Sequence, residues 1–168
     1  KALSARKSSA KDINAGIPGH TTANALARLQ RDVIAKKPQL VIVQFGINDA
    51  AVNVWQEPPA TKPTVSPEDY ENNLRRIVKT VKTAGADVIL MTPNPCRWTA
   101  ELRKLYGKPP YRPDDPDGFN ILLTRYAEIV RRVACQENLT LVDVYRAFET
   151  YGRQQGQSVD ALLLDGMH

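Results

Sequence analysis

The segment Asp165-Gly166-Met167-His168 places a carboxylate and an imidazole three positions apart. Side chains at this spacing meet in a turn or in the first turn of a helix. A carboxylate that holds one imidazole nitrogen leaves the other nitrogen able to take a proton from a hydroxyl group. The pair therefore predicts a general base, His168, oriented by Asp165. A plain surface pair at a chain end is the competing interpretation.

A side-chain amide follows a strand-like run in the stretch from Gln44 to Asp49. The preceding residues, 40–43, are all apolar, which is typical of a buried strand in a parallel sheet. Ligands of open α/β sheets bind at the carboxyl ends of the strands. We therefore expect the amide of Asn48 to donate a hydrogen bond to an oxyanion. Asp49 is expected to hold the loop, and a plain Asn-Asp turn is the alternative.

A second oxyanion donor is predicted at Gly19, in the turn formed by residues 16–19. Without a Cβ, this residue lets its backbone N–H approach a substrate closely. His20 is expected either to line the substrate pocket or only to begin a helix. Asn94, which follows a later apolar strand, is expected either to face the substrate or to satisfy the backbone before the next proline.

The elements that position these groups alternate along the chain. Strands are predicted at residues 11–15, 39–45, 87–91 and 139–144. Helices are predicted to begin at Thr21 or Thr22, at Ser66 and near Leu122, and to span residues 145–156. Residues 50–65 and 96–118 are predicted loops, and the second is long enough to be functional or disordered. This alternation predicts one domain over residues 1–168, with a parallel sheet covered by helices on both faces.

Composition argues against several classes of protein. The 168 residues are 42% hydrophobic and 24% charged, as in an ordinary globular domain. No apolar run approaches the roughly 20 residues of a membrane span. The net charge of +5 is scattered, and the one basic cluster, from Lys1 to Lys11, has no interleaved aromatic residues, so no nucleic-acid partner is expected. Two histidines are too few for a metal site built from histidine, and Cys96 and Cys135 lack metal-type spacing. Free thiols are expected, with a disulfide as the alternative.

Together the motifs resemble the SGNH hydrolases, also known as GDSL esterases and lipases. Residues 14–22 are similar to the second sequence block of that family, residues 46–49 to the third, and residues 165–168 to the fifth. The resemblance covers nearly the whole chain. It implies Gly19 and Asn48 as oxyanion donors, His168 as the catalytic base and Asp165 as its partner. It also implies an α/β fold, a three-layer α/β/α sandwich with a flavodoxin-like parallel sheet.

One part of the family pattern is absent. The first block of the family, Gly-Asp-Ser, carries the nucleophile at the end of the central strand, and these 168 residues contain no Gly-Asp-Ser. None of the serines has the required context: Ser4, Ser8, Ser9, Ser66 and Ser158. Both ends of the sequence look cut, so we expect the central strand and its serine to precede Lys1 in the parent protein. An inactive relative that has lost the serine is the alternative.

The expected function is hydrolysis of a carboxylic ester through an acyl-enzyme, with no metal and no organic cofactor implied. Polar, Pro-rich loops without a long apolar lid favour acetyl groups on carbohydrate, or another small ester, over long lipids. One alternative is a catalytically inactive relative that binds glycan in the same cleft. Another is a flavodoxin-like nucleotide or flavin module, for which the phosphate-cradling Gly-rich loop is missing.

The sequence does not decide the roles of several loop side chains, the compartment of the protein or its oligomeric state. Two interpretations fit a set of loop side chains: they form a wall that binds sugar or acyl groups, or they only pack the loop. These side chains are Trp55, Arg97, Trp98, Tyr106 and Tyr111. Compartment and oligomeric state are not predicted, and a secreted or periplasmic location stays open.

Overall fold

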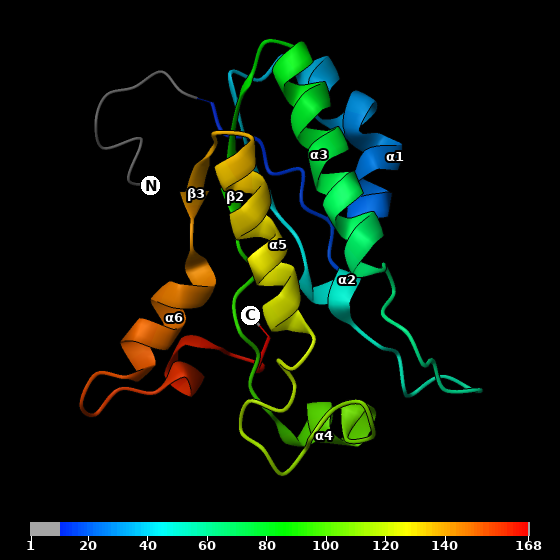
Figure 1. The fold of residues 1–168 in the computed structure, drawn as a ribbon, viewed down its shortest axis with the longest axis vertical. Helices are drawn as coiled ribbons and strands as arrows, with labels where there is room; N and C mark the ends of the chain where they lie inside the picture. The colour runs from blue at the N-terminus through cyan, green and yellow to red at the C-terminus, as the bar shows by residue number, and fades with distance from the viewer. Residues whose placement is uncertain (1–10, 168) are drawn as a thin grey trace.

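A parallel sheet lies at the centre of the computed structural model, which describes residues 11–167 (Figure 1). Within these residues the sheet has the strand order β1 (Leu40–Gln44), β2 (Asp87–Met91) and β3 (Thr140–Val142). All pairings are parallel, so Gln44, Met91 and Val142 end the strands side by side. The carboxyl ends of the strands therefore gather at one end of the sheet, where open α/β folds bind their ligands.

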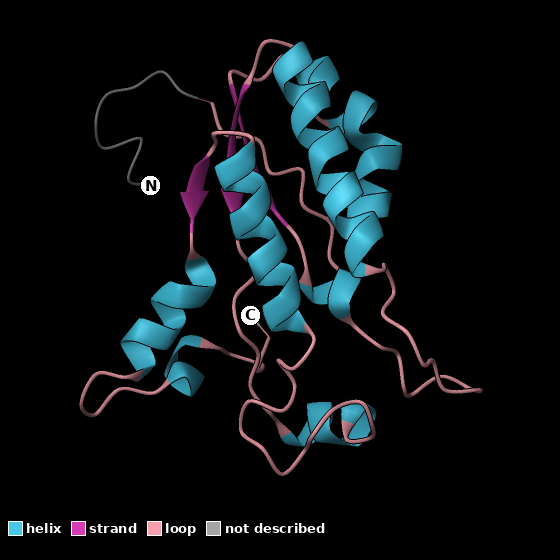
Figure 2. Cartoon of the chain, viewed as in Figure 1, coloured by secondary structure: helices cyan, strands magenta, loops and turns pink. Residues whose placement is uncertain are grey.

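Helices connect the strands, and long helices cover one face of the sheet, while others lie beyond the strand ends (Figure 2). The helices are α1 (Thr22–Asp32), α2 (Ile47–Ala50), α3 (Pro67–Thr83), α4 (Ala100–Tyr106), α5 (Leu123–Gln136) and α6 (Val144–Gly152), with short 3₁₀ helices η2 (Ile34–Lys36) and η3 (Val159–Leu162). Helices α3 and α5 pack on each other and on β2, and α1 packs on α3. Val43 and Leu90 are buried in this core together with Leu74 and Val130.

The other face of the sheet is exposed in the part of the chain that the structure describes. Leu40 and Ile42 on β1 are 48% and 59% exposed, and Val142 on β3 is 41% exposed. They share a face because side chains alternate along a strand and the register places Ile42 beside Ile89. The α/β class with a parallel sheet is confirmed, while a helical layer on this second face stays a prediction.

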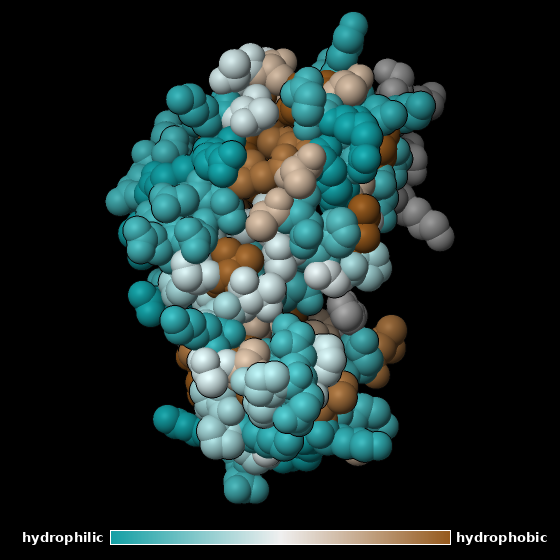
Figure 3. Space-filling view, turned by 90° about the vertical axis from the view of Figure 1, so that its right-hand side faces the viewer, coloured by the Kyte–Doolittle hydropathy of each residue, from teal (hydrophilic) through white to brown (hydrophobic). Residues whose placement is uncertain are grey.

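Two helix starts lie where the sequence predicts them. Ser66 caps α3 by accepting a hydrogen bond from the backbone N–H of Asp69 at 3.0 Å, with Pro67 at the first helical position. Thr21 caps α1 by accepting a hydrogen bond from the N–H of Asn24 at 3.4 Å. The outward side of this helical layer is largely hydrophilic, with small apolar patches (Figure 3). No helix among residues 11–167 is long and apolar enough to cross a membrane.

Three sequence-based expectations about local structure were wrong. Residues 11–15 form no strand, because no described strand lies beside them to share backbone hydrogen bonds. Residues 47–50, expected as the start of a loop, form the single helical turn α2. Within the long predicted loop, α4 is capped by Thr99, which accepts from the N–H of Leu102 at 3.2 Å, while the Leu102 side chain is buried. A helix of seven residues is too short for apolar periodicity to predict it.

Candidate active site

Asn48 lies on α2, immediately beyond the carboxyl end of β1. Its side-chain Nδ2 donates a hydrogen bond to the carbonyl oxygen of His20 at 3.2 Å. An amide nitrogen carries two N–H donors, so this contact uses one of them. Gly19, one residue before His20, has a φ of +77°, a backbone conformation that favours glycine. The fold thus brings Asn48 to the turn that holds Gly19, as the sequence predicts.

Asp49, the neighbour of Asn48, anchors the same region from inside the core. It is fully buried, and its Oδ1 accepts hydrogen bonds from the N–H of Thr22 at 2.9 Å and from the Thr22 hydroxyl at 2.5 Å. Asn73 on α3 donates to the same hydroxyl at 3.1 Å. Hydrogen bonds therefore fix the start of α1 at two points, from Asn48 to the carbonyl oxygen of His20 and from Thr22 to Asp49. A structural role for Asp49 is therefore confirmed, but its carboxylate holds the start of α1 rather than the loop after β1.

Burial raises the pKa of Asp49, because its ionised carboxylate is removed from water, and the hydrogen bonds from Thr22 oppose this rise. Its Oδ2 has no hydrogen-bond partner among the described residues. A carboxyl group whose pKa is higher in the folded state binds its proton more tightly there. Its contribution to stability is therefore fully present below the unfolded pKa of about 4 and is lost as the pH rises through the folded pKa.

We expect the full-length protein to lose stability relative to an Asp49→Asn variant as the pH rises above about 4. The asparagine oxygen can still accept from Thr22, but the side chain no longer titrates. Chemical denaturation at a series of pH values measures the difference in the free energy of unfolding between the two proteins. Asp87→Asn, at the exposed start of β2, is the matched control. A difference that is independent of pH in the Asp49→Asn comparison would contradict the expectation.

Asn94 follows β2 and links the carboxyl end of that strand, through a hydrogen bond, to the segment that contains Asp165. The side-chain Nδ2 donates to the carbonyl oxygen of Met167 at 2.8 Å and to that of Pro95 at 3.2 Å. Of the two roles predicted for Asn94, the structure therefore provides the one in which the amide satisfies the backbone. Contact between Asn94 and a substrate stays a prediction.

The Asp165–Met167 turn is docked tightly on the chain beyond β2. Asp165 Oδ1 accepts a hydrogen bond from the N–H of Met167 at 2.9 Å, and the Gly166 carbonyl accepts one from the N–H of Arg97 at 2.7 Å. Gly166 has a φ of +82°, and a Cβ at this position would lie 2.4 Å from the carbonyl oxygen of Arg97. Only glycine fits this approach without displacing the backbone. The predicted base, His168, lies outside the described residues.

The ends of the strands are linked to one another across the sheet. Gln44 Nε2 donates to the carbonyl oxygen of Thr92 at 3.1 Å, which ties the end of β1 to that of β2. The Thr92 hydroxyl donates to Asp143 Oδ1 at 3.2 Å, at the end of β3. Arg131 holds the same carboxylate through two bonds of 2.8 and 2.9 Å and keeps the pKa of Asp143 below its usual range. The carboxyl ends of the three strands are therefore joined to one another by hydrogen bonds.

The sequence model of the GDSL-like Lipase/Acylhydrolase family matches residues 1–168. The chain belongs to this family. It is 31% identical over 139 residues to an acetylxylan esterase of Geobacillus stearothermophilus, covering 81% of this chain and 55% of that protein. It is 27% identical over 156 residues to the esterase TesA of Pseudomonas aeruginosa, covering 93% of this chain and 60% of that protein.

Solved structures share the fold of this GDSL-family chain. The acetylxylan esterase Axe2 of Geobacillus stearothermophilus matches with a TM-score of 0.69 and 29% identity, over 93% of this chain and 63% of the other. A lipase/acylhydrolase of Enterococcus faecalis matches with a TM-score of 0.64 and 25% identity, over 93% and 65% of the two chains. The chain thus spans about 55 to 60% of the length of the curated relatives described above.

Sequence reasoning missed Thr22 and Asn73, the partners that hold Asp49 in this GDSL-family fold. Asn73 lies on α3 between the buried residues Tyr70 and Leu74. A polar side chain next to the apolar stripe of a helix is the one signal that could have pointed to it. Thr22 was expected only as a helix cap, because its partner lies 27 residues away in the sequence.

The aromatic residues in and beside the two predicted loops mainly pack against one another. Tyr111 and Phe119 are buried and stacked with ring centroids 4.9 Å apart, while Trp98 meets Phe119 edge to face at 5.2 Å. Trp55 is half-exposed and donates from Nε1 to the hydroxyl of Tyr106 at 3.3 Å. Packing therefore accounts for Tyr111, whereas the exposed ring of Trp55 stays open to either interpretation.

Neither cysteine forms a disulfide: Cys96 is buried and Cys135 is exposed, as the prediction of free thiols requires. Burial raises the pKa of the Cys96 thiol to about 12. Within residues 11–167, no three side chains of His, Cys, Asp or Glu are grouped as a metal site requires.

Proposed function

We propose that the full-length protein hydrolyses carboxylic esters through an acyl-enzyme, with Asn48 and Gly19 as oxyanion donors. The hydrogen bond from Asn48 to the carbonyl oxygen of His20 carries this proposal, because it holds the amide beside the Gly19 turn. Further support comes from the Asp165 turn, which is docked beyond β2 at the same end of the sheet. Preorganised donors of this kind stabilise the charge that develops on an ester carbonyl under attack.

The nucleophile in this proposal is the serine of a Gly-Asp-Ser block outside these 168 residues. Within the described residues, Ser66 and Ser158 act as helix caps; Ser4, Ser8 and Ser9 lie outside them. The serine oxygen attacks the ester carbonyl while His168 takes its proton, and His168 then returns that proton to the leaving alcohol. Water then attacks the acyl-serine: His168 takes a proton from the water and returns it to the serine oxygen, which leaves as the free serine while the carboxylic acid is released.

Asp165 orients the imidazole of His168 and stabilises it while it is positively charged. His20 and Asn94 border the substrate. The Nδ1 atom of His20 supports this placement, because it is buried without a hydrogen-bond partner among the described residues. An unsatisfied buried nitrogen of this kind gains free energy when a ligand group pairs with it.

We propose an acetyl group on carbohydrate, or another small ester, as the substrate. Relatives of this chain include acetylxylan esterases, and its loops are polar and rich in proline. We expect the full-length protein to hydrolyse p-nitrophenyl acetate with a kcat/KM about tenfold or more above that for the octanoate ester. Steady-state assays with both esters measure this ratio. A preference for octanoate would refute the acetyl proposal, and hydrolysis of neither ester would favour an inactive, glycan-binding relative.

A further inference from the structure

A cavity of about 620 Å³ lies between α6, η3 and the segment of residues 115–121 that leads into α5. Pockets that bind small molecules commonly have volumes of roughly 300 to 1,000 Å³. Gly19, Asn48 and Asp165 do not line this cavity, so it is separate from the oxyanion site. The charged groups on its wall are four carboxylates and two guanidinium groups, namely Asp115, Asp117, Glu149, Asp160, Arg97 and Arg153.

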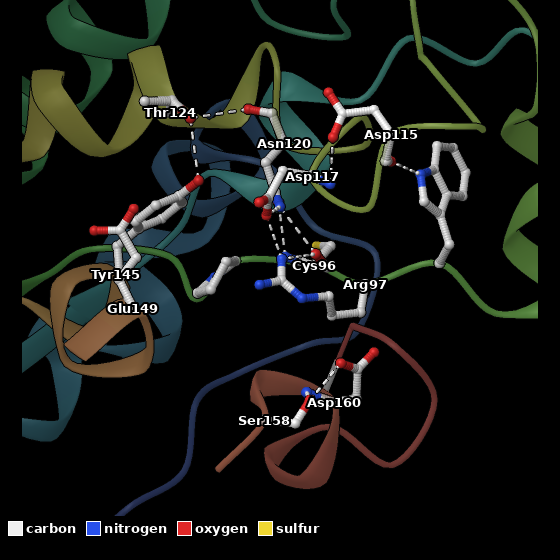
Figure 4. A network of polar contacts seen from close by, with 12 residues as sticks. Cys96, Arg97, Asp115, Asp117, Asn120, Thr124, Tyr145, Glu149, Ser158 and Asp160 are labelled. Atoms are coloured by element: carbon white, nitrogen blue, oxygen red, sulfur yellow. Dashed lines mark hydrogen bonds and ion pairs between the residues drawn. The ribbon is translucent and has the colours of Figure 1, made fainter. Parts of the chain in front are cut away.

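Most of the polar side chains on this wall are held in place by their neighbours. Figure 4 shows the guanidinium group of Arg97 between Asp117, with which it forms an ion pair, and the Ser158–Asp160 pair at the start of η3. Ser158 Oγ donates to Asp160 Oδ2 at 2.6 Å. On the α6 side, the hydroxyl of Tyr145 lies 3.1 Å from that of Thr124. Side chains that are already ordered lose little conformational entropy when a ligand binds.

The cavity adjoins the candidate active site through the chain beyond β2. Pro95 and Arg97 line the cavity. The N–H of Arg97 donates to the Gly166 carbonyl at 2.7 Å, and Asn94 donates to both the Pro95 and the Met167 carbonyl oxygens. A ligand in the cavity therefore lies against the segment that supports the Asp165–Met167 turn.

The chemistry of the wall favours an uncharged ligand with many hydroxyl groups. Both guanidinium groups on the wall are already paired with carboxylates, Arg97 with Asp117 and Arg153 with Glu149, so an anion would meet no unpaired guanidinium group there. The other two carboxylates already accept hydrogen bonds, Asp160 from Ser158 and Asp115 from the N–H of Asp117, which reduces their attraction for a cation. Apolar residues are a minority of the lining, so a long acyl chain would leave polar groups without partners. A hydroxyl group can donate to a carboxylate and accept from a guanidinium group at the same time.

We propose that this cavity binds sugar residues on the alcohol side of an oligosaccharide ester. The inference rests on the proposed esterase function and specifies its substrate class. The oxyanion site holds the acyl group of such a substrate, while the cavity beside the Asp165–Met167 turn holds the part that leaves as the alcohol. Binding energy gained there acts on oligosaccharide esters and not on small aryl esters, which carry no sugar residue to occupy the cavity.

The variants Glu149→Gln and Arg153→Gln test this proposal in the full-length protein. Both side chains lie on the cavity wall and are 3.8 Å apart in a solvent-exposed ion pair, so their replacement spares the core. We expect KM for an acetylated xylo-oligosaccharide to rise about tenfold, with kcat/KM for p-nitrophenyl acetate unchanged. Glu128→Gln is the matched control, because Glu128 forms a comparable ion pair with Arg131 on α5 and does not line the cavity.

Calorimetric titration with an unacetylated xylo-oligosaccharide provides a readout that does not depend on catalysis. We expect full-length protein carrying His168→Ala to bind this sugar, and the addition of Glu149→Gln or Arg153→Gln to weaken binding about tenfold. Unchanged KM and unchanged sugar binding in both cavity variants would overturn the inference and leave the esterase proposal standing. A KM that rises equally for both esters would also overturn it. Failure of wild-type protein to hydrolyse any ester would overturn the esterase proposal, and the titration would still decide whether the cavity binds sugar.

Discussion

Replacing Asp165 by Asn in the full-length protein is expected to lower kcat for an acetate ester by about 10⁴-fold. An amide cannot stabilise a positively charged imidazole, and it favours the wrong tautomer of the neutral ring. The change is conservative for the local structure, because the asparagine Oδ1 can still accept the hydrogen bond that Met167 N–H makes at 2.9 Å. A large loss of kcat in a variant that still folds would therefore show that Asp165 acts in catalysis and not only in folding.

Steady-state kinetics with p-nitrophenyl acetate measure this effect, and thermal unfolding of the same samples checks the fold. Asp87→Asn is the matched control, since Asp87 lies at the opposite end of β2. A loss of less than about tenfold in the Asp165→Asn variant would remove Asp165 from the proposed mechanism.

Replacing Asn48 by Ala should reduce kcat by about 10² to 10³-fold, the usual effect of losing one oxyanion donor. KM should change little, because the amide bonds the oxyanion of the transition state more strongly than the carbonyl of the bound ester. The same change also removes the 3.2 Å hydrogen bond to the His20 carbonyl oxygen, at a cost in stability of about 1 kcal/mol.

Comparing kcat with the free energy of unfolding separates these two consequences of Asn48→Ala. Asn72→Ala replaces an exposed amide on α3 and should leave both quantities unchanged. A wild-type kcat in the Asn48→Ala variant would refute the oxyanion role. A kcat that recovers fully under stabilising conditions would assign the effect to lost structure.

The elements that could be predicted are those whose signals are local in the sequence. The helix cap at Ser66 and the apolar runs that form β1 and β2 can be recognised from a few consecutive residues, and the structure confirms them. Helix α4 escaped prediction because its stability depends on contacts from elsewhere, including the edge-to-face contact of Tyr106 with Phe119 at 5.2 Å. Residues 11–15 were predicted as a strand, but only Ile13 among them favours strands, and a strand also needs a partner.

The sequence by itself determined the family, the parallel α/β class and the identity of the motifs, because each motif is a short run of defined residue types. Only the tertiary structure decided how those motifs are held. Thr22 with Asp49 and Asn94 with Met167 are joined across 27 and 73 residues of chain. The charged cavity likewise draws its wall from segments far apart in sequence. Such contacts depend on how helices and strands pack, which spacing along the chain does not specify.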